Sequence, residues 1–395
     1  MKIFDAIVVG KGLIGSAAAK YLAEAGLDIA VIGADEPTDA NTATVFASHY
    51  DQGRVQRIVG RDAVWTQLNI DSTNVYPTLQ SQTGINFHYP VGCLYVTVHE
   101  HDSYLQNLGS QARQFGFAYR LYDNGGEIGD AYPDFVFPQA ARANFEAAPS
   151  GHINPRKLIE AQLAVCRQHG SAVMSDTVVQ ATRVNGTMQV VTQGGQTYLA
   201  KQVLLAPGGF ANFMQLVQRK LALQLKSETV LLAKVSEAEA ERLAQFPSLL
   251  YEMETPDLEE IYLVRPIQYP DGNWYLKMGS NLTADKRFNT LGEVQDWFRH
   301  GSSDTNLAVQ KAALDVLMPG LQVQEYFTKR CIITYTQHKK QYIGQVEEGM
   351  YVATGGNGYS AMCSDAVGRL AAHNLMHGSL PDPYEAEDFR LVWAD

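Results

Sequence analysis

The chain opens with a glycine pattern that can hold the diphosphate of a dinucleotide. An apolar run at 5–9 predicts a buried strand, and Gly10, Gly12 and Gly15 follow it with G-x-G-x-x-G spacing. In such a pattern the first glycine permits a tight turn, the second lets backbone amides approach a pyrophosphate, and the third lets the next helix pack on the strand. The helix expected at 16–25 would then direct its unsatisfied N–H groups at the phosphates.

The next expected strand, at 28–32, departs from the dinucleotide pattern where it ends. Gly33 stands in the place of the acidic residue that binds the adenosine ribose in that pattern. Asp35 and Glu36 follow shortly after. Two interpretations remain open, because these carboxylates reach the ribose if the loop folds back and are otherwise solvated loop charges.

Two arginines in a polar segment indicate a site for an anion. Arg54 and Arg57 can direct two permanent charges towards one phosphate or carboxylate. The alternative is a pair of surface arginines. The flanking residues His49 and Asp51 favour a buried polar network over a solvated face.

Lys277 lies inside an expected strand between the apolar residues Leu276 and Met278. A buried ammonium group requires a compensating partner or a function. The alternative is that strand alternation places Lys277 on the solvent face of an antiparallel sheet.

A second glycine turn, at 355–358, follows a strand expected at 350–354 and precedes a helix expected from about Ser360 to Leu375. The positive end of that helix could stabilise negative charge on a bound ring, and the alternative is a plain tight turn. Strand, glycine turn and helix thus occur at both ends of the chain. We expect the two ends to meet in one nucleotide-binding domain.

The predicted fold class is α/β, with a Rossmann-like domain of glutathione-reductase type and a second α+β domain. Strands at 228–235, 260–267 and 273–279 predict a mostly antiparallel sheet in that second domain. The chain is expected to weave between the two. The nucleotide domain would comprise 1–80, 150–222 and 325–395, and the substrate domain 81–149 and 223–324.

Composition narrows the possible partners and location. The net charge of −11 argues against nucleic acid or an anionic membrane as a partner, and no apolar run is long enough to span a bilayer. The four cysteines lack C-x-x-C spacing and the ten histidines lack H-E-x-x-H spacing, so neither a metal site nor a disulfide framework is expected. The first strand starts almost at Met1, which leaves no room for a targeting peptide, and we expect a cytoplasmic protein.

Four segments, in this order, resemble the D-amino-acid oxidase family of flavoproteins, nearest the monomeric sarcosine oxidase and glycine oxidase branch. They are the N-terminal glycine pattern, the S-H-Y-D-Q-G-R-V-Q-R stretch at 48–57, W-Y-L-K-M-G at 274–279, and R-C-I-I-T at 330–334 with the 355–358 turn. The resemblance covers nearly the whole chain. It implies FAD as cofactor, and the residues expected to bind it are Gly10, Gly12, Leu13, Ile14, Gly15, Ser48, His49, Arg54, Val179, Gly208, Cys331, Gly356, Asn357, Gly358, Tyr359 and Ser360.

The resemblance also implies roles at the flavin. Arg57 would lie nearer the substrate than Arg54, and Lys277 would lie over the flavin and activate O2. Cys331 falls where the sarcosine branch attaches flavin through a thioether, the alternative being a buried free thiol. Expected catalytic residues are Lys277, Arg57, Tyr262 and Tyr359.

We do not expect sarcosine itself to be the substrate. In that branch a lysine helps to bind the substrate carboxylate, and Ser360 stands in its place here. Asn281 stands in the place of a histidine of that branch. The expected reaction is oxidation of an amine or amino acid to an imine, by hydride transfer to FAD and then reduction of O2 to H2O2. The alternatives are a flavin dehydrogenase with another acceptor and a non-catalytic FAD-binding subunit. Further candidates for the pocket are Arg265, His338 and Lys340, which have a default interpretation as ordinary sheet or loop residues.

Overall fold

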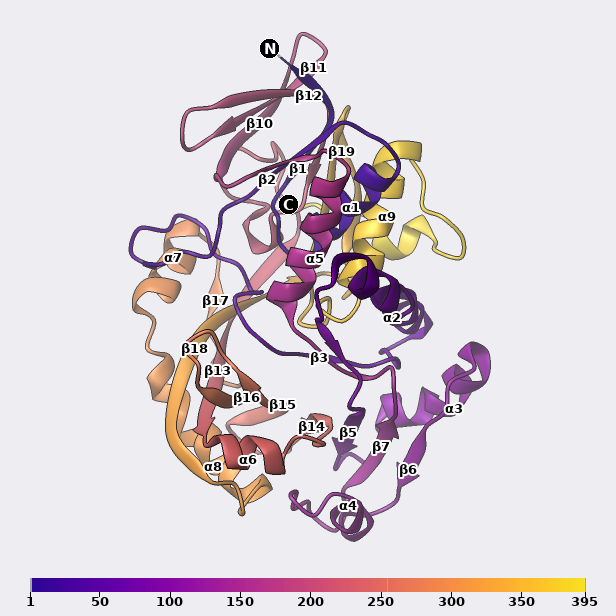
Figure 1. Cartoon of the computed structure of the whole chain (residues 1–395), viewed down its shortest axis with the longest axis vertical. Helices are drawn as coiled ribbons and strands as arrows, with labels where there is room; N and C mark the ends of the chain where they lie inside the picture. Colours follow the sequence, from indigo (N-terminus) through magenta and orange to yellow (C-terminus); the bar gives the residue numbers. More distant parts are fainter. Residues whose placement is uncertain (1, 254, 395) are drawn as a thin grey trace.

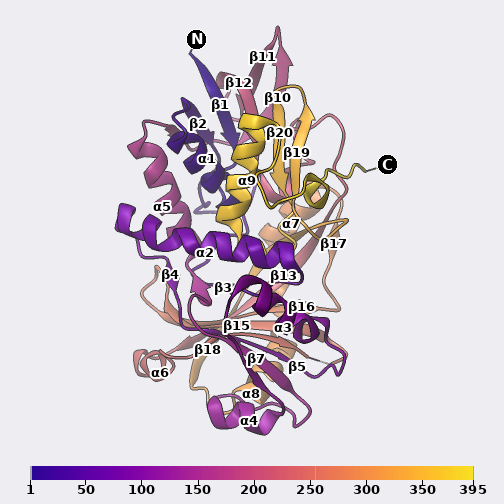
Figure 2. The ribbon, with the colours of Figure 1, turned by 90° about the vertical axis from the view of Figure 1, so that its right-hand side faces the viewer.

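A computed structural model describes residues 2–253 and 255–394 of the chain. The molecule has two parts, each built on its own large sheet, and both chain ends lie in the upper part (Figure 1). Helix α2 (Ala63–Thr83) runs across the boundary between the two parts, as the turned view shows (Figure 2). Within the described residues, no helix is both long enough and apolar enough to cross a bilayer.

The upper part contains an eight-stranded sheet whose central strands are parallel. Strand β1 pairs in parallel with β12 on one side and β2 on the other, while β10 and β11 form an antiparallel extension. The order is β10-β11-β12-β1-β2-β9, and β20 joins β12 and β19. The strands are β1 (Ile3–Val9), β2 (Ile29–Ile32), β9 (Ala172–Met174), β10 (Val178–Val184), β11 (Thr187–Thr192), β12 (Thr197–Leu205), β19 (Tyr342–Glu347) and β20 (Met350–Thr354).

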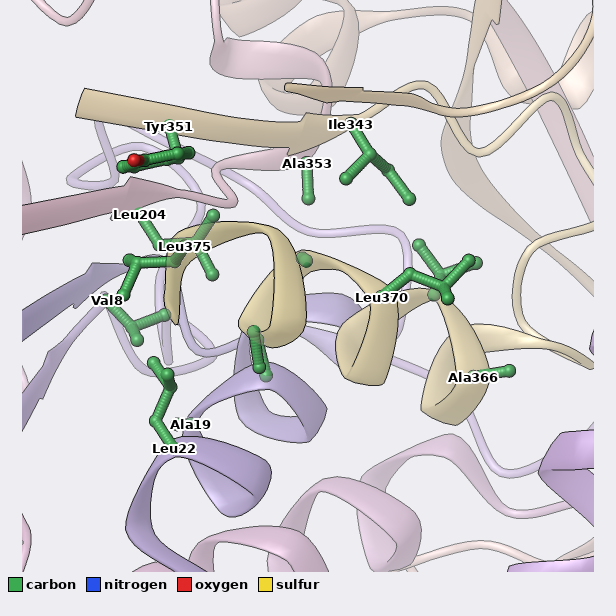
Figure 3. Close-up of a cluster of buried hydrophobic side chains, with 14 of the residues drawn as sticks. Val8, Ala19, Leu22, Leu204, Ile343, Tyr351, Ala353, Ala366, Leu370 and Leu375 are labelled. Carbon is green, nitrogen blue, oxygen red and sulfur yellow. The ribbon is translucent and has the colours of Figure 1, made fainter. Parts of the chain in front are cut away.

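Helices from both chain ends pack together on this sheet. A Cβ on Gly368 of α9 (Ser364–His377) would lie 2.4 Å from Cβ of Ala17 in α1 (Leu13–Glu24), so the two helices cross in direct contact. Figure 3 shows part of the apolar core, in which the side chains of Val8, Leu204 and Leu375 lie close together. The burial of this core stabilises the close approach of the two ends, as expected from the sequence. Helix α5 (Pro155–Gln168) covers the same region.

The lower part contains a nine-stranded, mostly antiparallel sheet, and the predicted fold class is confirmed. Its order is β17-β13-β16-β15-β14-β5-β7-β6, with β18 on the other side of β13. The strands are β5 (Cys93–Thr97), β6 (Arg120–Tyr122), β7 (Arg142–Glu146), β13 (Leu223–Val235), β14 (Ser248–Glu252), β15 (Leu258–Gln268), β16 (Trp274–Leu282), β17 (Arg287–Phe288) and β18 (Val323–Thr336). Its helices are α3 (Ser103–Phe115), α4 (Gly125–Ala131), α6 (Glu237–Arg242), α7 (Leu291–His300) and α8 (Leu307–Leu317).

Short elements join the two parts. A three-stranded sheet holds β3 (Arg54–Gln56), β8 (Gly151–Ile153) and β4 (His88–Tyr89) in antiparallel pairing. Strand β18 pairs with β13 from 323 to 336, so the domain division expected at residue 325 falls inside this strand. The remaining elements are short 3-10 turns at Gly208–Phe210, Ser303–Asn306 and Ala386–Phe389.

Helix α9 begins later than the sequence pattern predicts. It starts at Ser364, because the residues before it form turns in which the N–H of Ser360 donates to Gly356 O at 2.9 Å and that of Met362 to Tyr359 O at 3.3 Å. The expected helix start at Ser360 is therefore wrong. The glycine turn and the positive end of α9 are separate features.

Candidate active site

A long cavity runs from the β1–α1 turn towards the lower sheet. Its empty space, including its open mouth, is about 1470 Å³. Both chain ends contribute to its wall. The lining includes residues 9–14, 32–34, 45–50, 176–178, 206–210 and 331–334, with Gly355, Gly356, Gly358 and Ser360.

The glycine cradle at one end of the long cavity has no space for a side chain at Gly10 or Gly15. Gly10 has φ +98°, and a Cβ there would lie 2.3 Å from Ala206 O. A Cβ on Gly15 would lie 1.9 Å from Gly10 O. Gly12 caps α1 without a side-chain hydrogen bond, and residues 12–14 line the cavity. The first N–H groups of α1 have no intrahelical partner and are placed to bind an anion.

The acidic residues after β2 have other partners. Lys11 forms an ion pair with Asp35 and donates to Ser175 Oγ at 2.7 Å. Arg156 binds both carboxylate oxygens of Glu36, at 2.6 and 2.8 Å. Both acids are exposed, as expected for solvated loop charges, and each also pairs with a cation.

A buried charge cluster lies where the two parts of the molecule meet. Lys277 is 1% exposed, and its Nζ lies 2.6 Å from Asp51 Oδ2 and donates to Gly53 O at 2.7 Å. Arg54 also forms an ion pair with Asp51, and Tyr269 donates its hydroxyl to the same carboxylate at 2.6 Å. The prediction of a buried network around Arg54 is confirmed, and Lys277 does not face solvent.

The cluster controls the protonation of its members. Burial alone would raise the pKa of Asp51, but Lys277 and Arg54 hold it well below its usual range. Burial and then the neighbouring Arg54 lower the pKa of Lys277 to about 8, against the opposing effect of Asp51. With Lys277 protonated, two cations share one carboxylate, so the cluster carries one excess positive charge.

Arg57 lies apart from this cluster, and it is 4% exposed. Its Nε and Nη1 have no hydrogen-bond partner. The guanidinium carbon lies 4.8 Å from the ring centre of Tyr104 and 5.6 Å from that of Tyr359. Arg57 is not among the residues that line either cavity described here.

A second, smaller cavity, which we call the side pocket, adjoins the long cavity. The two share Arg54, Glu228, Ile333, Gly358 and Ala361 as lining residues. The other polar residues of the side pocket come from the lower sheet and from the loops that precede α2 and α9. They include Arg61, Glu260, Tyr262, Ser280, Asn281, Tyr335, Asn357 and Tyr359.

Sheet register aligns three polar residues of the side pocket. Glu260 of β15 pairs with Asn281 of β16, and pairing of Thr229 with Ser280 places Glu228 of β13 on the other side of Asn281. We call Glu228, Asn281 and Glu260 the acidic row. Cys331 of β18 pairs with Glu228 and lies at the end of the row.

Tyr262 crosses from one strand to another within this pocket. A Cβ on Gly279 would lie 2.0 Å from the Tyr262 ring, so the glycine leaves room for the ring over β16. The Tyr262 hydroxyl donates to Glu228 Oε1 at 3.2 Å. The Tyr359 hydroxyl lies 3.1 Å from Glu260 Oε2 and accepts from Arg61 at 2.8 Å.

Most residues proposed from the sequence lie around these two cavities. Gly15 and Lys277 support the walls without lining them, and Val178 lines the long cavity in place of Val179. Those lining the long cavity are Gly10, Gly12, Leu13, Ile14, Ser48, His49, Arg54, Gly208, Cys331, Gly356, Gly358 and Ser360, and those lining the side pocket include Tyr262, Asn357 and Tyr359.

Three pocket candidates from the sequence have other contacts. His338 contacts Arg390 O at 2.9 Å, Lys340 pairs with Asp62 at 3.1 Å, and Arg265 donates to Ala244 O. None of the three is among the lining residues. In the described part of the chain, no cluster of His, Cys, Asp or Glu could hold a metal ion.

The sequence reasoning missed Glu228, Glu260, Arg61 and Tyr335. Glu228 and Glu260 both occur in runs expected to be strands, and a carboxylate at a buried alternation position is the available signal. The sequence does not reveal that the strands carrying Glu228 and Glu260 lie on either side of the same strand, β16.

Comparison with known proteins now places the chain. The model of a family described as FAD dependent oxidoreductase matches residues 5–374. The chain belongs to this family. The N-methyl-L-tryptophan oxidase of Yersinia pestis (strain Pestoides F) is 26% identical over 207 residues, or 52% of this chain and 53% of the relative. The chain thus spans about half the length of the curated relatives it matches.

Solved structures share the fold of this FAD-dependent oxidoreductase over its whole length. NikD, an unusual amino acid oxidase essential for nikkomycin biosynthesis, has a TM-score of 0.80 at 16% identity, covering 100% of this chain and 99% of NikD. Glycine oxidase from Geobacillus kaustophilus has a TM-score of 0.71 at 19% identity, covering 99% of each chain.

The cavity geometry fits the family's cofactor. A dinucleotide needs a cradle free of side chains beside an uncapped helix start, and Gly10, Gly12 and the first turn of α1 provide it. It also needs an extended space, which continues past Ser48 and Arg54 to Cys331.

Proposed function

We propose that this oxidoreductase removes a hydride from the carbon next to an amine nitrogen and leaves an imine. The observation that carries the proposal is the shared wall of the two cavities. Arg54, Glu228 and Gly358 line both, so a molecule in the side pocket can contact a ring held in the long cavity. The curated relative named above acts on an N-methylated amino acid by its name, which supports this substrate class.

The proposed division of labour follows from the lining residues. Bound FAD would supply a two-electron acceptor for the hydride. Gly10, Gly12, Leu13 and Ile14 would hold its diphosphate through backbone N–H groups. The side pocket would orient the substrate and exclude water, while Tyr262 and Tyr359 donate hydrogen bonds within it.

We further propose that O2 is the final acceptor and takes up two electrons and two protons to form H2O2. A fixed positive charge in a dry site stabilises the superoxide produced by the first electron. The Asp51, Arg54 and Lys277 cluster provides one excess positive charge beside the long cavity. This supports Lys277 as the residue that promotes oxygen reduction.

The test separates the two half-reactions in the purified enzyme. Lys277→Met is expected to slow reaction of the reduced enzyme with O2 by roughly 100-fold, with little change in anaerobic reduction by substrate. Lys277→Arg keeps the charge and should retain most of the oxygen rate. Equal slowing of both half-reactions would remove the assignment, and a wild-type enzyme that reacts slowly with O2 but rapidly with a quinone would indicate a dehydrogenase.

Cys331 is the proposed attachment point if the flavin is covalent. It is 7% exposed and is the cysteine that lines the long cavity in the described residues. Burial raises the pKa of its thiol to about 11. Acid precipitation of the holoenzyme should leave FAD in the wild-type pellet and release it from Cys331→Ser. Complete release from the wild type would show non-covalent binding.

A further inference from the structure

The acidic row places two carboxylates in the wall of the side pocket, and neither is in direct contact with a cation. Glu228 is 8% exposed yet lines both cavities, and Glu260 is half-buried. Among the described residues, no lysine, arginine or histidine nitrogen lies within 4.0 Å of either carboxylate, although such pairs are recorded elsewhere in the molecule. Buried carboxylates are normally paired with a cation, because burial without one is costly.

The side chains that donate hydrogen bonds to the two carboxylates of the acidic row are uncharged hydroxyl and amide groups. Glu228 accepts from the Tyr262 hydroxyl, and Glu260 accepts from the Tyr359 hydroxyl and from Asn281 Nδ2 at 3.1 Å. Lys226 reaches Asn281 Oδ1 at 3.0 Å, but its charge is paired with Asp285. The direct contacts of both carboxylates are therefore neutral donors.

The arginines of the pocket are already engaged. Arg54 is paired with Asp51 and donates to Ser48 O at 2.5 Å and Gly53 O at 3.0 Å. Arg61 is exposed at the rim, bonded to Tyr359, and stacked 4.4 Å from its ring centre. No buried arginine in the described lining is free to bind a substrate carboxylate.

Aromatic rings complete a site suited to cations. Tyr262, Tyr335 and Tyr359 all line the side pocket, and ring faces attract ammonium groups. Tyr335 is close enough to the acidic row that, after burial, Glu228 and Glu260 contribute to raising its pKa to about 12. Carboxylates and ring faces thus surround the same space.

We propose that the substrate carries two amino groups and that the acidic row binds both. Glu228 lines both cavities, so it faces the amine that reacts. Adjacent strands lie about 4.8 Å apart, which separates the Glu228 and Glu260 backbones by roughly 10 Å across β16. The side chains of both residues line the side pocket, and Glu260 binds the second ammonium group there. This assignment rests on the proposed amine oxidation and narrows its substrate class to diamines and related polyamines.

The first experiment compares three compounds with the same carbon chain and one amino group in common. Putrescine, n-butylamine and γ-aminobutyrate differ only in an ammonium, a methyl or a carboxylate at the far end. Anaerobic mixing with the holoenzyme gives the rate and apparent Kd of flavin bleaching. Putrescine should have an apparent Kd at least about tenfold lower than n-butylamine, since hydrogen bonds to charged groups contribute roughly 1.5–3 kcal/mol, and γ-aminobutyrate should bind most weakly.

Matched variants assign the preference to the acidic row. Glu260→Gln should remove the roughly tenfold preference for putrescine. Glu259→Gln makes the same change one residue away, at an exposed position that does not line the side pocket, and should leave it intact. A preference that survives in Glu260→Gln overturns the proposal, as does tighter binding of γ-aminobutyrate than of putrescine.

A binding measurement distinguishes failure of this inference from failure of the proposed function. Perturbation of the oxidised flavin absorbance by putrescine and by acetate reports binding without turnover. If no amine or amino acid bleaches the flavin, the proposed function is wrong, and tighter binding of putrescine than of acetate still supports a cation site. If amino acids bleach the flavin and putrescine neither binds nor reacts, amine oxidation stands and the inference is overturned.

Discussion

The cradle and the side pocket are built in different ways. The cradle comes from one continuous segment, in which Gly10, Gly12 and Gly15 follow a strand and begin a helix. The side pocket comes from strands that are far apart in sequence, and its acidic row exists because β13 and β15 flank β16. The first depends on close backbone contacts and the second on the register of a sheet. Substitutions in the two regions should therefore fail in different ways.

The largest effect is expected in the cradle. Gly15→Ala places a Cβ 1.9 Å from Gly10 O, where backbone cannot yield without moving α1. We expect a loss of at least about 4 kcal/mol in the free energy of unfolding and no bound FAD. Thermal unfolding and flavin absorbance measure these. Gly26→Ala, which meets no atom within 4 Å, is the control and should cost about 1 kcal/mol through its φ of +82°. A stable, yellow Gly15→Ala protein would contradict the described cradle.

The second effect tests the junction between the two regions. Asp51→Asn leaves Arg54 and Lys277 buried without their shared anion. We expect it to lower the free energy of unfolding by about 3–5 kcal/mol in chemical denaturation. Asp28→Asn removes an exposed pair with Lys2 and should cost at most about 1 kcal/mol. Equal costs for the two variants would mean that the cluster is solvated.

The third effect is a pH dependence of oxygen reduction. The lowered pKa of Lys277, about 8, means that its positive charge is present below that pH and lost above it. The rate of reoxidation by O2 should fall roughly tenfold between about pH 7 and pH 9, as the protonated fraction does. Lys277→Arg should abolish this fall, and a profile unchanged by that variant would assign the pH dependence to another group.

Other groups around Lys277 should not produce this pH profile. Burial raises the pKa values of Tyr262, Tyr269 and Cys331, and the cations hold that of Asp51 well below its usual range. The charged and titratable groups facing Lys277 are Asp51, Arg54, Glu228, Tyr262, Tyr269 and Cys331.

The smallest effect is expected in the side pocket. Gly279→Ala would bring a Cβ to 2.0 Å from the Tyr262 ring, whose half-buried side chain can swing away. We expect a stability cost of about 1 kcal/mol, retained FAD and a several-fold higher KM, since the hydrogen bond from Tyr262 to Glu228 is lost. Steady-state kinetics measures the KM, and flavin absorbance measures the retained FAD. Loss of FAD in this variant would show that the two regions are not independent.

Sequence patterns predicted best where the structure is local. The turn at Gly10–Gly15 and the helix that follows it depend on residues that are close together in the sequence. Prediction was wrong at the start of α9, because Ser360 bonds back to Gly356 and delays the helix to Ser364.

The order of residues alone determined the dinucleotide cradle, the two-part architecture and the membership of an FAD-dependent family, because glycine spacing and strand periodicity are local properties. Tertiary structure alone decided that Lys277 shares Asp51 with Arg54, that Arg57 lies buried behind Tyr359, and that Glu228 and Glu260 flank one residue. Those contacts join segments far apart in sequence, and strand order and register decide which such segments meet.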